Sequence, residues 1–312
     1  MTPAEFAERL KTRDGFLILS HKNPDGDTLG SGAALCSALR RLGKAAYICA
    51  NPQITERTDA YIHCFYASAD FVPQTVLAVD IATPGLFPRG FEGHVDLCVD
   101  HHPSNSFYAD ETLVVSEKSA CGEIVLEIIE ALCGSLTPEE ATLLYIALTT
   151  DTGCFQYMNT NADTMNCAAK LIGYGAEYHK VVHDYFRKVS MARVMLEGMI
   201  YSGMRYYRDG KLVVAFVTRQ MLRDAGTTEN DLDDLAGLPG RIAGNQVSIL
   251  IREMENGDSK VSVRSTPAVD SCAICAQFGG GGHAMAAGCT LHCDPYEAEK
   301  LLLQATEQVW PA

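Results

Sequence analysis

Three short apolar runs near the start of the chain each stop at a polar residue. They are residues 15–20 before His21, residues 76–79 before Asp80 and residues 95–99 before Asp100. None of these runs alternates apolar and polar positions, which is typical of strands buried on both faces of a parallel sheet. Parallel sheets bind ligands at the carboxyl ends of their strands. We therefore expect these polar side chains to converge on one edge.

The remaining pattern predicts two domains joined by helices. Residues 28–42, 119–132 and 138–149 have helical periodicity, and the last of these helices leads to Asp151. Strands and helices alternate through residues 1–185, as expected of a doubly wound α/β domain. Residues 163–204 are mostly helical with a break near 173–175, and 186–204 form the expected connector. Residues 205–312 then predict a smaller α+β domain, with strands at 212–218, 246–252 and 260–264, a helix at 270–277 and a glycine loop.

Composition narrows the class of protein. The chain has 312 residues, of which 47% are hydrophobic, and a net charge of −14. An acidic surface argues against binding long nucleic acid but permits a small phosphorylated substrate beside metal ions. No signal peptide or membrane span is predicted, so we expect a cytoplasmic protein with twelve reduced cysteines. A zinc knuckle formed by Cys272, Cys275, Cys289 and Cys293 is a less favoured alternative.

The polar residues themselves predict a two-metal centre. His21, Asp25 and Asp27 lie on a Pro- and Gly-containing segment, where the two carboxylates can diverge toward neighbouring ions. Asp80 is the expected bridging carboxylate, and His101 and Asp151 complete the second site. Oxygen and imidazole ligands favour Mn²⁺, with Mg²⁺, Co²⁺ or Fe²⁺ as alternatives, and two such ions cleave phosphoesters through a shared hydroxide. Each motif alone is more often a turn, a helix cap or a satisfied core residue. Their joint occurrence favours a metal centre.

These motifs resemble those of the DHH phosphoesterase superfamily. The matching segments are His21-x-x-x-Asp25-x-Asp27, Val79-Asp80, Asp100-His101-His102 and Thr150-Asp151, and in the second half Phe278-Gly-Gly-Gly-Gly-His283. The resemblance implies that His21, Asp25 and Asp80 bind one Mn²⁺ and that Asp27, Asp80, His101 and Asp151 bind the other. It also implies that Asp100 orients a histidine, that His102 faces the phosphate and that Asn105 helps to place it.

The second domain resembles the DHH-associated domain, which implies that it holds the far phosphate or base of the substrate. The candidate binding residues are Arg264, Ser265, Gly280, Gly281, Gly282, His283 and Arg241. Glycines allow a phosphate to approach backbone N–H groups, and an arginine fork binds phosphate with two hydrogen bonds. Without that resemblance, an exposed charge at the end of a strand is the more common reading of Arg264.

The two-domain layout resembles nanoRNase/pAp phosphatases and single-chain cyclic dinucleotide phosphodiesterases. The expected function is therefore Mn²⁺-dependent hydrolysis of short oligoribonucleotides to 5′-mononucleotides, removal of the 3′-phosphate of pAp, or both. Cyclic di-AMP or pApA is the alternative substrate, and an inorganic pyrophosphatase or a catalytically silent nucleotide sensor is less favoured. The sequence does not decide whether the protein forms a homodimer, and no membrane partner is expected.

Overall fold

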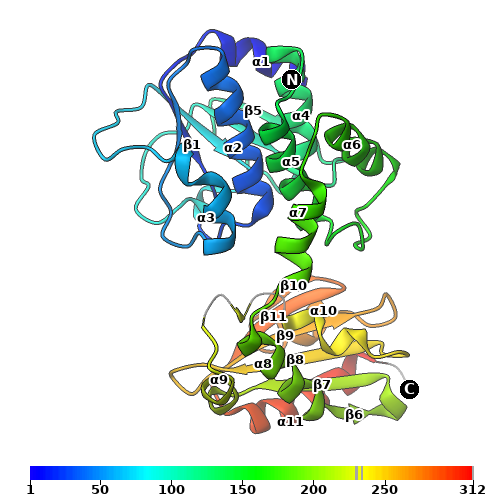
Figure 1. The fold of residues 1–312 in the computed structure, drawn as a ribbon. Helices are drawn as coiled ribbons and strands as arrows, with labels where there is room; N and C mark the ends of the chain where they lie inside the picture. Colours follow the sequence, from blue (N-terminus) through cyan, green and yellow to red (C-terminus); the bar gives the residue numbers. More distant parts are fainter. Residues whose placement is uncertain (229–230, 233–234, 311–312) are drawn as a thin grey trace. The chain divides into compact units, whose positions relative to one another are not determined.

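The computed structural model describes residues 1–228, 231–232 and 235–310, and it divides into two compact units. Unit 1 spans Met1–Lys188 and unit 2 spans Val189–Ala312, each with its own sheet and helices (Figure 1). No helix in the described part of the chain is long and apolar enough to cross a membrane.

Unit 1 contains a five-stranded parallel sheet in the order β2-β1-β3-β4-β5. The strands are β1 Phe16–Leu19, β2 Ala46–Ile48, β3 Thr75–Val79, β4 Leu97–Asp100 and β5 Glu111–Val114. All four neighbouring pairs are parallel, so every carboxyl end lies at the same edge. The strand order reverses between β1 and β3, because the chain leaves β1 toward one side of the sheet and β3 toward the other. Ligands of open parallel sheets bind at such a reversal.

Helices pack on one face of this sheet. They are α1 Pro3–Lys11, α2 Gly26–Arg41, α3 Glu56–Ile62, α4 Cys121–Cys133, α5 Pro138–Asp151, α6 Ala162–Gly173 and α7 Tyr178–Val182. Alternate strand residues such as Ile18 and Leu77 enter the core beneath them. The opposite face carries a smaller cluster, which includes Leu19 and Ala78 and is covered by loop residues such as Phe87. The parallel α/β prediction is confirmed, with its helices gathered on one face.

Helices α2 and α5 cross closely, which brings two parts of the candidate site together. A Cβ at Gly30 would lie 2.4 Å from the backbone oxygen of Leu143, and one at Gly26 would lie 2.5 Å from Thr150. Larger residues would force the helices apart. Because Gly26 starts α2 and Thr150 is in the last turn of α5, the amino end of α2 lies beside Asp151.

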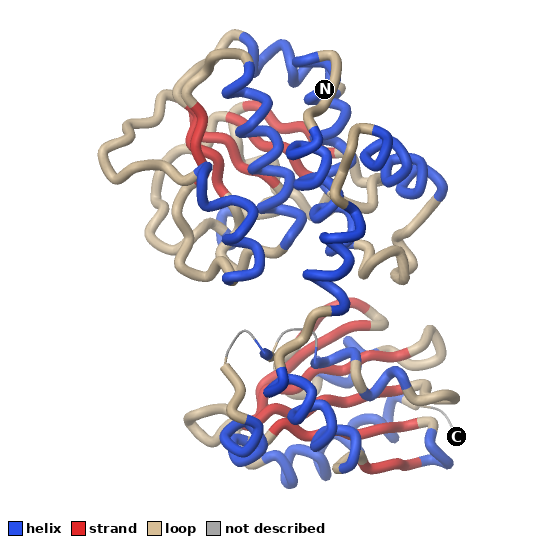
Figure 2. Tube along the Cα trace, in the orientation of Figure 1, coloured by secondary structure: helices blue, strands red, loops and turns tan. Residues whose placement is uncertain are grey.

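Unit 2 is a six-stranded mixed sheet flanked by helices, and Figure 2 shows its strands side by side. In chain order the elements are α8 Met191–Ser202, β6 Arg205–Tyr207, β7 Leu212–Val217, α9 Arg219–Ala225, β8 Val247–Glu253, β9 Ser259–Ser265, α10 Ser271–Ala276, β10 Gly281–His283, β11 Ala286–Leu291 and α11 Pro295–Val309. The sheet order is β10-β11-β9-β8-β7-β6, with only β7 and β8 parallel. The predicted smaller α+β domain is thus confirmed.

Some local predictions differ from the structure. Helix α2 begins at Gly26, two residues before the predicted start, because Asp25 caps it. The glycine motif is not simply a loop, since Gly281–His283 pairs with β11 in an antiparallel hairpin. Helix α8, expected in the connector, packs through Leu196 and Ile200 into the core of unit 2.

Candidate metal centre

The strand ends and two helix ends of unit 1 bring the predicted ligands together. His21 follows β1, Asp80 follows β3, and His101 follows β4, so the reversal between β1 and β3 lies within the cluster. Asp151 ends α5, and the Thr137 capping box and Pro138 fix where that helix begins. The convergence expected from the sequence is present at one sheet edge.

Asp25 and Asp27 both belong to the start of α2 rather than to a free loop. One carboxylate oxygen of Asp25 accepts hydrogen bonds from the backbone N–H groups of Asp27 and Thr28, which is an N-cap. Asp27 is fully buried and accepts hydrogen bonds from the N–H groups of Cys121 and Gly122 at the start of α4. Two helix amino ends therefore fix these carboxylates, because each end offers unpaired N–H donors.

Asp80 has a left-handed backbone with φ of 60°. This conformation is uncommon for residues other than glycine, although Asp and Asn tolerate it better than most. Strained backbone of this kind is concentrated at functional sites, where the surrounding structure enforces it. Here the N–H of Asp80 donates to the oxygen of Val99, so the neighbouring strand β4 holds the turn.

Three overlapping groups of side chains could each hold a metal ion. They are His21 with Asp25 and Asp80, Asp27 with His101 and Asp151, and Asp80 with His101 and His102. Nε2 of His101 lies 3.8 Å from Asp27 Oδ2, 3.5 Å from Asp80 Oδ1 and 3.6 Å from Asp151 Oδ2. Nε2 of His21 lies 3.5 Å from Asp25 Oδ2 and 3.9 Å from Asp80 Oδ2. These separations exceed hydrogen-bond lengths but suit donors arranged around a central ion.

Two atoms at the centre of this cluster lack a hydrogen-bond partner. Within the described structure, Asp80 Oδ1 and His101 Nε2 are buried and unpartnered. Nδ1 of His101 lies 3.1 Å from the oxygen of Lys118, and a carbonyl only accepts, so Nδ1 carries the proton. Nε2 then presents its lone pair to the carboxylates, as metal-ligating histidines do. Buried polar atoms are rarely left unsatisfied, so these residues fit a divalent cation.

The electrostatics of the cluster also favour cations. Burial raises the pKa of Asp27 and Asp80 well above their ordinary value, and the neighbouring carboxylates raise it further. Burial likewise raises the pKa of Asp151. Carboxylates brought together out of water oppose each other's ionisation. Divalent ions would remove that penalty, and imidazole with carboxylate is a donor set for Mn²⁺, Mg²⁺ or Co²⁺.

Asp100 and His102 form a second pair beside the cluster. The ring nitrogen Nδ1 of His102 donates to Asp100 Oδ1 at 2.8 Å, and this hydrogen bond raises the pKa of His102. Burial would raise the pKa of Asp100, but hydrogen bonds from His102 and Asn105 outweigh it and lower the pKa. The sequence assigned Asn105 to the substrate phosphate. In the structure Asn105 is buried, and its Nδ2 donates to Asp100 Oδ2 at 2.7 Å. Asn105 therefore positions the Asp100 carboxylate.

In unit 2, two of the predicted substrate-binding residues occupy one row across the sheet. Arg264 on β9 lies opposite Ala286 on β11, and Ala286 lies opposite His283 on β10. Residues directly opposite in antiparallel strands share a face, so the two exposed side chains flank the small Ala286 on strands about 10 Å apart. A Cβ at Gly280 would lie 2.3 Å from the oxygen of Gly288, which is why the turn before β10 requires glycine.

The other predicted residues of unit 2 have different surroundings. Ser265 Oγ donates to the oxygen of Val269 at 2.6 Å and lies 2.8 Å from Ser271 Oγ, so this hydroxyl holds the segment between β9 and α10. Arg241 is exposed and its Nη1 donates to the Tyr201 hydroxyl at 3.4 Å. Gly281 and Gly282 are exposed in β10, where their backbone is accessible.

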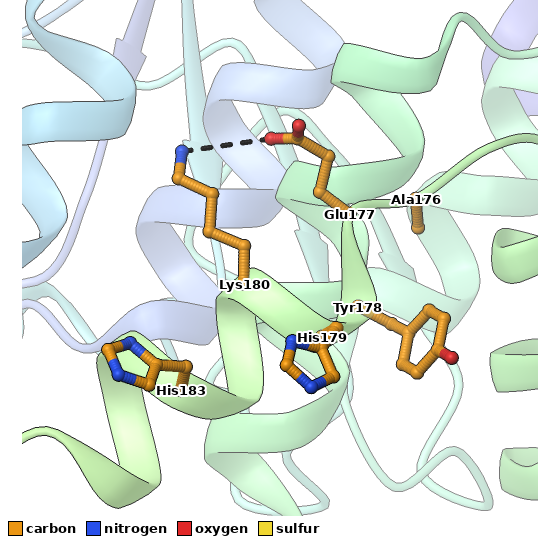
Figure 3. A pocket seen from close by; sticks show the side chains of 6 residues that line it. All are labelled: Ala176, Glu177, Tyr178, His179, Lys180 and His183. Carbon is orange, nitrogen blue, oxygen red and sulfur yellow. Dashed lines mark ion pairs between the residues drawn. The ribbon is translucent and has the colours of Figure 1, made fainter.

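A separate hollow of about 490 Å³ lies on unit 1, but it shares no residue with the metal cluster. Its lining, drawn in Figure 3, is Ala176, Glu177, Tyr178, His179, Lys180 and His183. Lys180 Nζ lies 3.7 Å from Glu177 Oε2, so the one lysine in the lining already has an acidic partner. No motif in the sequence analysis points to this hollow.

The fold and the site define a two-unit protein with a candidate metal-binding site at one sheet edge, and comparison with known proteins gives its family. Residues 15–148 match the family described as "DHH family, N-terminal domain", and residues 209–310 match the "DHHA1 domain". The chain is 35% identical to the bifunctional oligoribonuclease and PAP phosphatase NrnA of Thermus thermophilus, covering 97% of this chain and 92% of that protein. The chain belongs to the DHH family, and the resemblance noted in the sequence is confirmed.

Other relatives agree with this placement. The protein of the same description from Bacillus subtilis is 25% identical, covering 96% of both chains. A cyclic-di-AMP phosphodiesterase, GdpP of Geobacillus thermodenitrificans, is 23% identical over 88% of this chain but 44% of its own length. The crystal structure of an exopolyphosphatase-related protein from Bacteroides fragilis has the same fold, with a TM-score of 0.88 at 22% identity over 98% of this chain and 95% of that one.

Proposed function

We propose that the chain is a two-metal phosphoesterase that hydrolyses short oligoribonucleotides to 5′-mononucleotides and removes the 3′-phosphate of pAp. The observation that carries the proposal is the set of three overlapping ligand groups around the unpartnered atoms of Asp80 and His101. The named activity of relatives that align along nearly the whole chain supports the substrate class. Mn²⁺ is the proposed cofactor, two ions per site; carboxylate and imidazole donors suit it, and the resemblance of the motifs to the DHH phosphoesterases favours it over Mg²⁺ or Co²⁺.

Different residues would bind the ions, contact the reacting phosphate and bind the rest of the substrate. His21, Asp25 and Asp80 would hold one ion, and Asp27, Asp80, His101 and Asp151 the other. Two bound ions would activate water and neutralise the charge of the phosphate. His102, oriented through Nδ1 by Asp100, donates a hydrogen bond to the phosphate or a proton to the leaving oxygen. Arg264, His283 and the exposed glycines of β10 would bind a distal phosphate or base, with Arg241 as a further cation.

The cysteines indicate the cellular compartment in which we expect the protein to act. All twelve cysteines are unpaired, and we place the reaction in a reducing cytoplasm, where such thiols persist.

Asn105→Ala is expected to lower kcat about 10- to 100-fold, a part of the about 10²- to 10⁴-fold that a positioned general acid or base contributes. The change removes the donor to Asp100 Oδ2, and Asp100 then holds His102 less firmly. The measurement is kcat and its pH profile with Mn²⁺. Ser106→Ala is the matched control. Among the described residues the Ser106 hydroxyl makes one hydrogen bond, to the backbone oxygen of Ala82, so the change should alter kcat less than about twofold. If the pH profile of kcat were unchanged in Asn105→Ala, Asn105 would not position Asp100 and His102.

The proposal is tested by hydrolysis assays run in parallel with Mn²⁺. The substrates are a diribonucleotide, pAp, cyclic di-AMP, pApA and pyrophosphate, and EDTA is the control. Fast turnover of the diribonucleotide or pAp is the expected outcome. Dominant turnover of cyclic di-AMP or pApA would favour the alternative that GdpP represents. Turnover of pyrophosphate alone, or activity that resists EDTA, would contradict the proposal.

A further inference from the structure

Phe107 is an exposed aromatic residue with a left-handed backbone, close in the chain to the metal ligands. Its φ is 52° and its exposed fraction is 65%. A bulky side chain disfavours this conformation, because Cβ crowds the following carbonyl oxygen. An exposed ring also forgoes the stabilisation that burial would give. Two unfavourable features at one residue that follows the Asp100-His101-His102 motif closely in the chain suggest a role in binding.

The surrounding structure holds Phe107 in place. Its N–H donates to Asn105 Oδ1 at 2.7 Å, and Nδ2 of the same amide donates to Asp100 Oδ2 at 2.7 Å. Asp100 in turn accepts from His102. Two hydrogen bonds through a single amide therefore join the strained residue to the carboxylate that orients His102.

The residues on either side of Phe107 are anchored to the segment that follows Asp80. The N–H of Ser106 donates to the oxygen of Ala82 at 2.9 Å, and the Tyr108 hydroxyl donates to the oxygen of Ile81 at 2.8 Å. The Tyr108 ring packs edge-on against Phe87 in a partly buried cluster. The fold thus partly buries the neighbouring aromatic ring and leaves that of Phe107 in solvent.

We propose that Phe107 stacks against the base of a nucleotide whose phosphate is bound at the metal centre. The inference rests on the proposed function, since only a nucleotide substrate brings a planar aromatic group beside its phosphate. Stacking needs no hydrogen-bond donor from the ring and tolerates every base, which suits an enzyme for short oligoribonucleotides of any sequence. Phe107 is therefore a binding residue for the base, separate from the groups that hold the ions.

The test compares Phe107→Ala on two substrates that differ only in their bases. One is a diribonucleotide, and the other has the same ribose–phosphate backbone without bases. Phe107→Ala should raise KM for the diribonucleotide about 5- to 100-fold and leave kcat within about twofold, as for loss of one stacked base. Kinetics on the baseless substrate should not change. Phe107→Tyr and Phe107→Trp should keep the normal KM, and Val72→Ala, at an 81% exposed apolar residue elsewhere in unit 1, should match the parent.

A thermal measurement separates binding from a structural role. Glycine adopts a positive φ without strain, so Phe107→Gly should raise Tm by about 1–3 °C while raising KM as Phe107→Ala does. A residue that merely stabilised the fold would lower Tm when truncated.

Three outcomes would overturn the stacking inference. An unchanged KM in Phe107→Ala would overturn the stacking inference and leave the proposed function standing. Equal losses on both substrates would also overturn it, because the defect would then lie at the metal centre. A parent enzyme that hydrolyses only pyrophosphate would overturn the proposed function and the stacking inference together.

Discussion

Asp80→Asn is expected to lower kcat about a thousandfold or more, which corresponds to about 4 kcal/mol of lost transition-state stabilisation. Asp80 belongs to two of the three ligand groups, and its Oδ1 is one of the two unpartnered atoms at their centre. Asparagine keeps the shape of the side chain and tolerates the left-handed backbone at this position. The loss would therefore report the missing charge rather than a broken turn. Steady-state kinetics with Mn²⁺ and the best substrate measure it.

The same variant should be more stable than the parent when metal is removed. Burial and neighbouring carboxylates raise the pKa of Asp80, so an ionised carboxylate at neutral pH destabilises the metal-free protein. A neutral amide removes that repulsion, and Tm in EDTA at pH 7.5 should rise. Asp70→Asn is the matched control, because Asp70 is an exposed carboxylate of unit 1 that belongs to none of the candidate metal-binding groups among the described residues. A kcat within tenfold of the parent in Asp80→Asn would contradict the assignment of Asp80.

The position of the site could be predicted from the sequence because its ligands follow buried strands. Apolar runs ending at His21, Asp80 and Asp100 carry both the strand and its carboxyl end in one local pattern. The capping box at Thr137 similarly marks the start of the helix that ends at Asp151. These features are local in the sequence, so they can be recognised without knowledge of the tertiary contacts.

The features that the sequence did not reveal depend on contacts between distant segments. The amino end of α4 holds Asp27 across more than ninety residues, and the oxygen of Lys118 fixes the proton on His101. Asn105 lies within a motif whose chemistry suggests substrate contact, yet tertiary packing buries it behind Asp100. The N–H of Phe107 donates to Asn105 Oδ1, and the other end of that buried amide is held by Asp100; no residue-type preference predicts the positive φ of Phe107.

Removal of metal is expected to abolish turnover and to lower Tm at pH 7.5 by about 10 °C. Ligands that bind only the folded state stabilise it by about 4 kcal/mol at a thousandfold excess over Kd, and each kcal/mol shifts Tm by about 2–4 °C at this domain size. Within the described structure, Asp80 Oδ1 and His101 Nε2 have no hydrogen bond that would compensate for their burial. Thermal melts with Mn²⁺ and with EDTA, read for the transition of unit 1, make the comparison.

The gap between the two melts should depend on pH, with opposite slopes in the two samples. In the metal-free protein the pKa values of Asp27 and Asp80 are raised above 3.8, so their protonated forms stabilise the fold at low pH. That stability is lost as pH rises through the raised pKa values. Mn²⁺ requires deprotonated ligands, so the stability it adds grows over the same range. The gap should therefore be small near pH 5 and large at pH 7.5. The gap should shrink in Asp80→Asn and persist in Asp70→Asn. A gap that did not change with pH would place the bound metal away from these carboxylates.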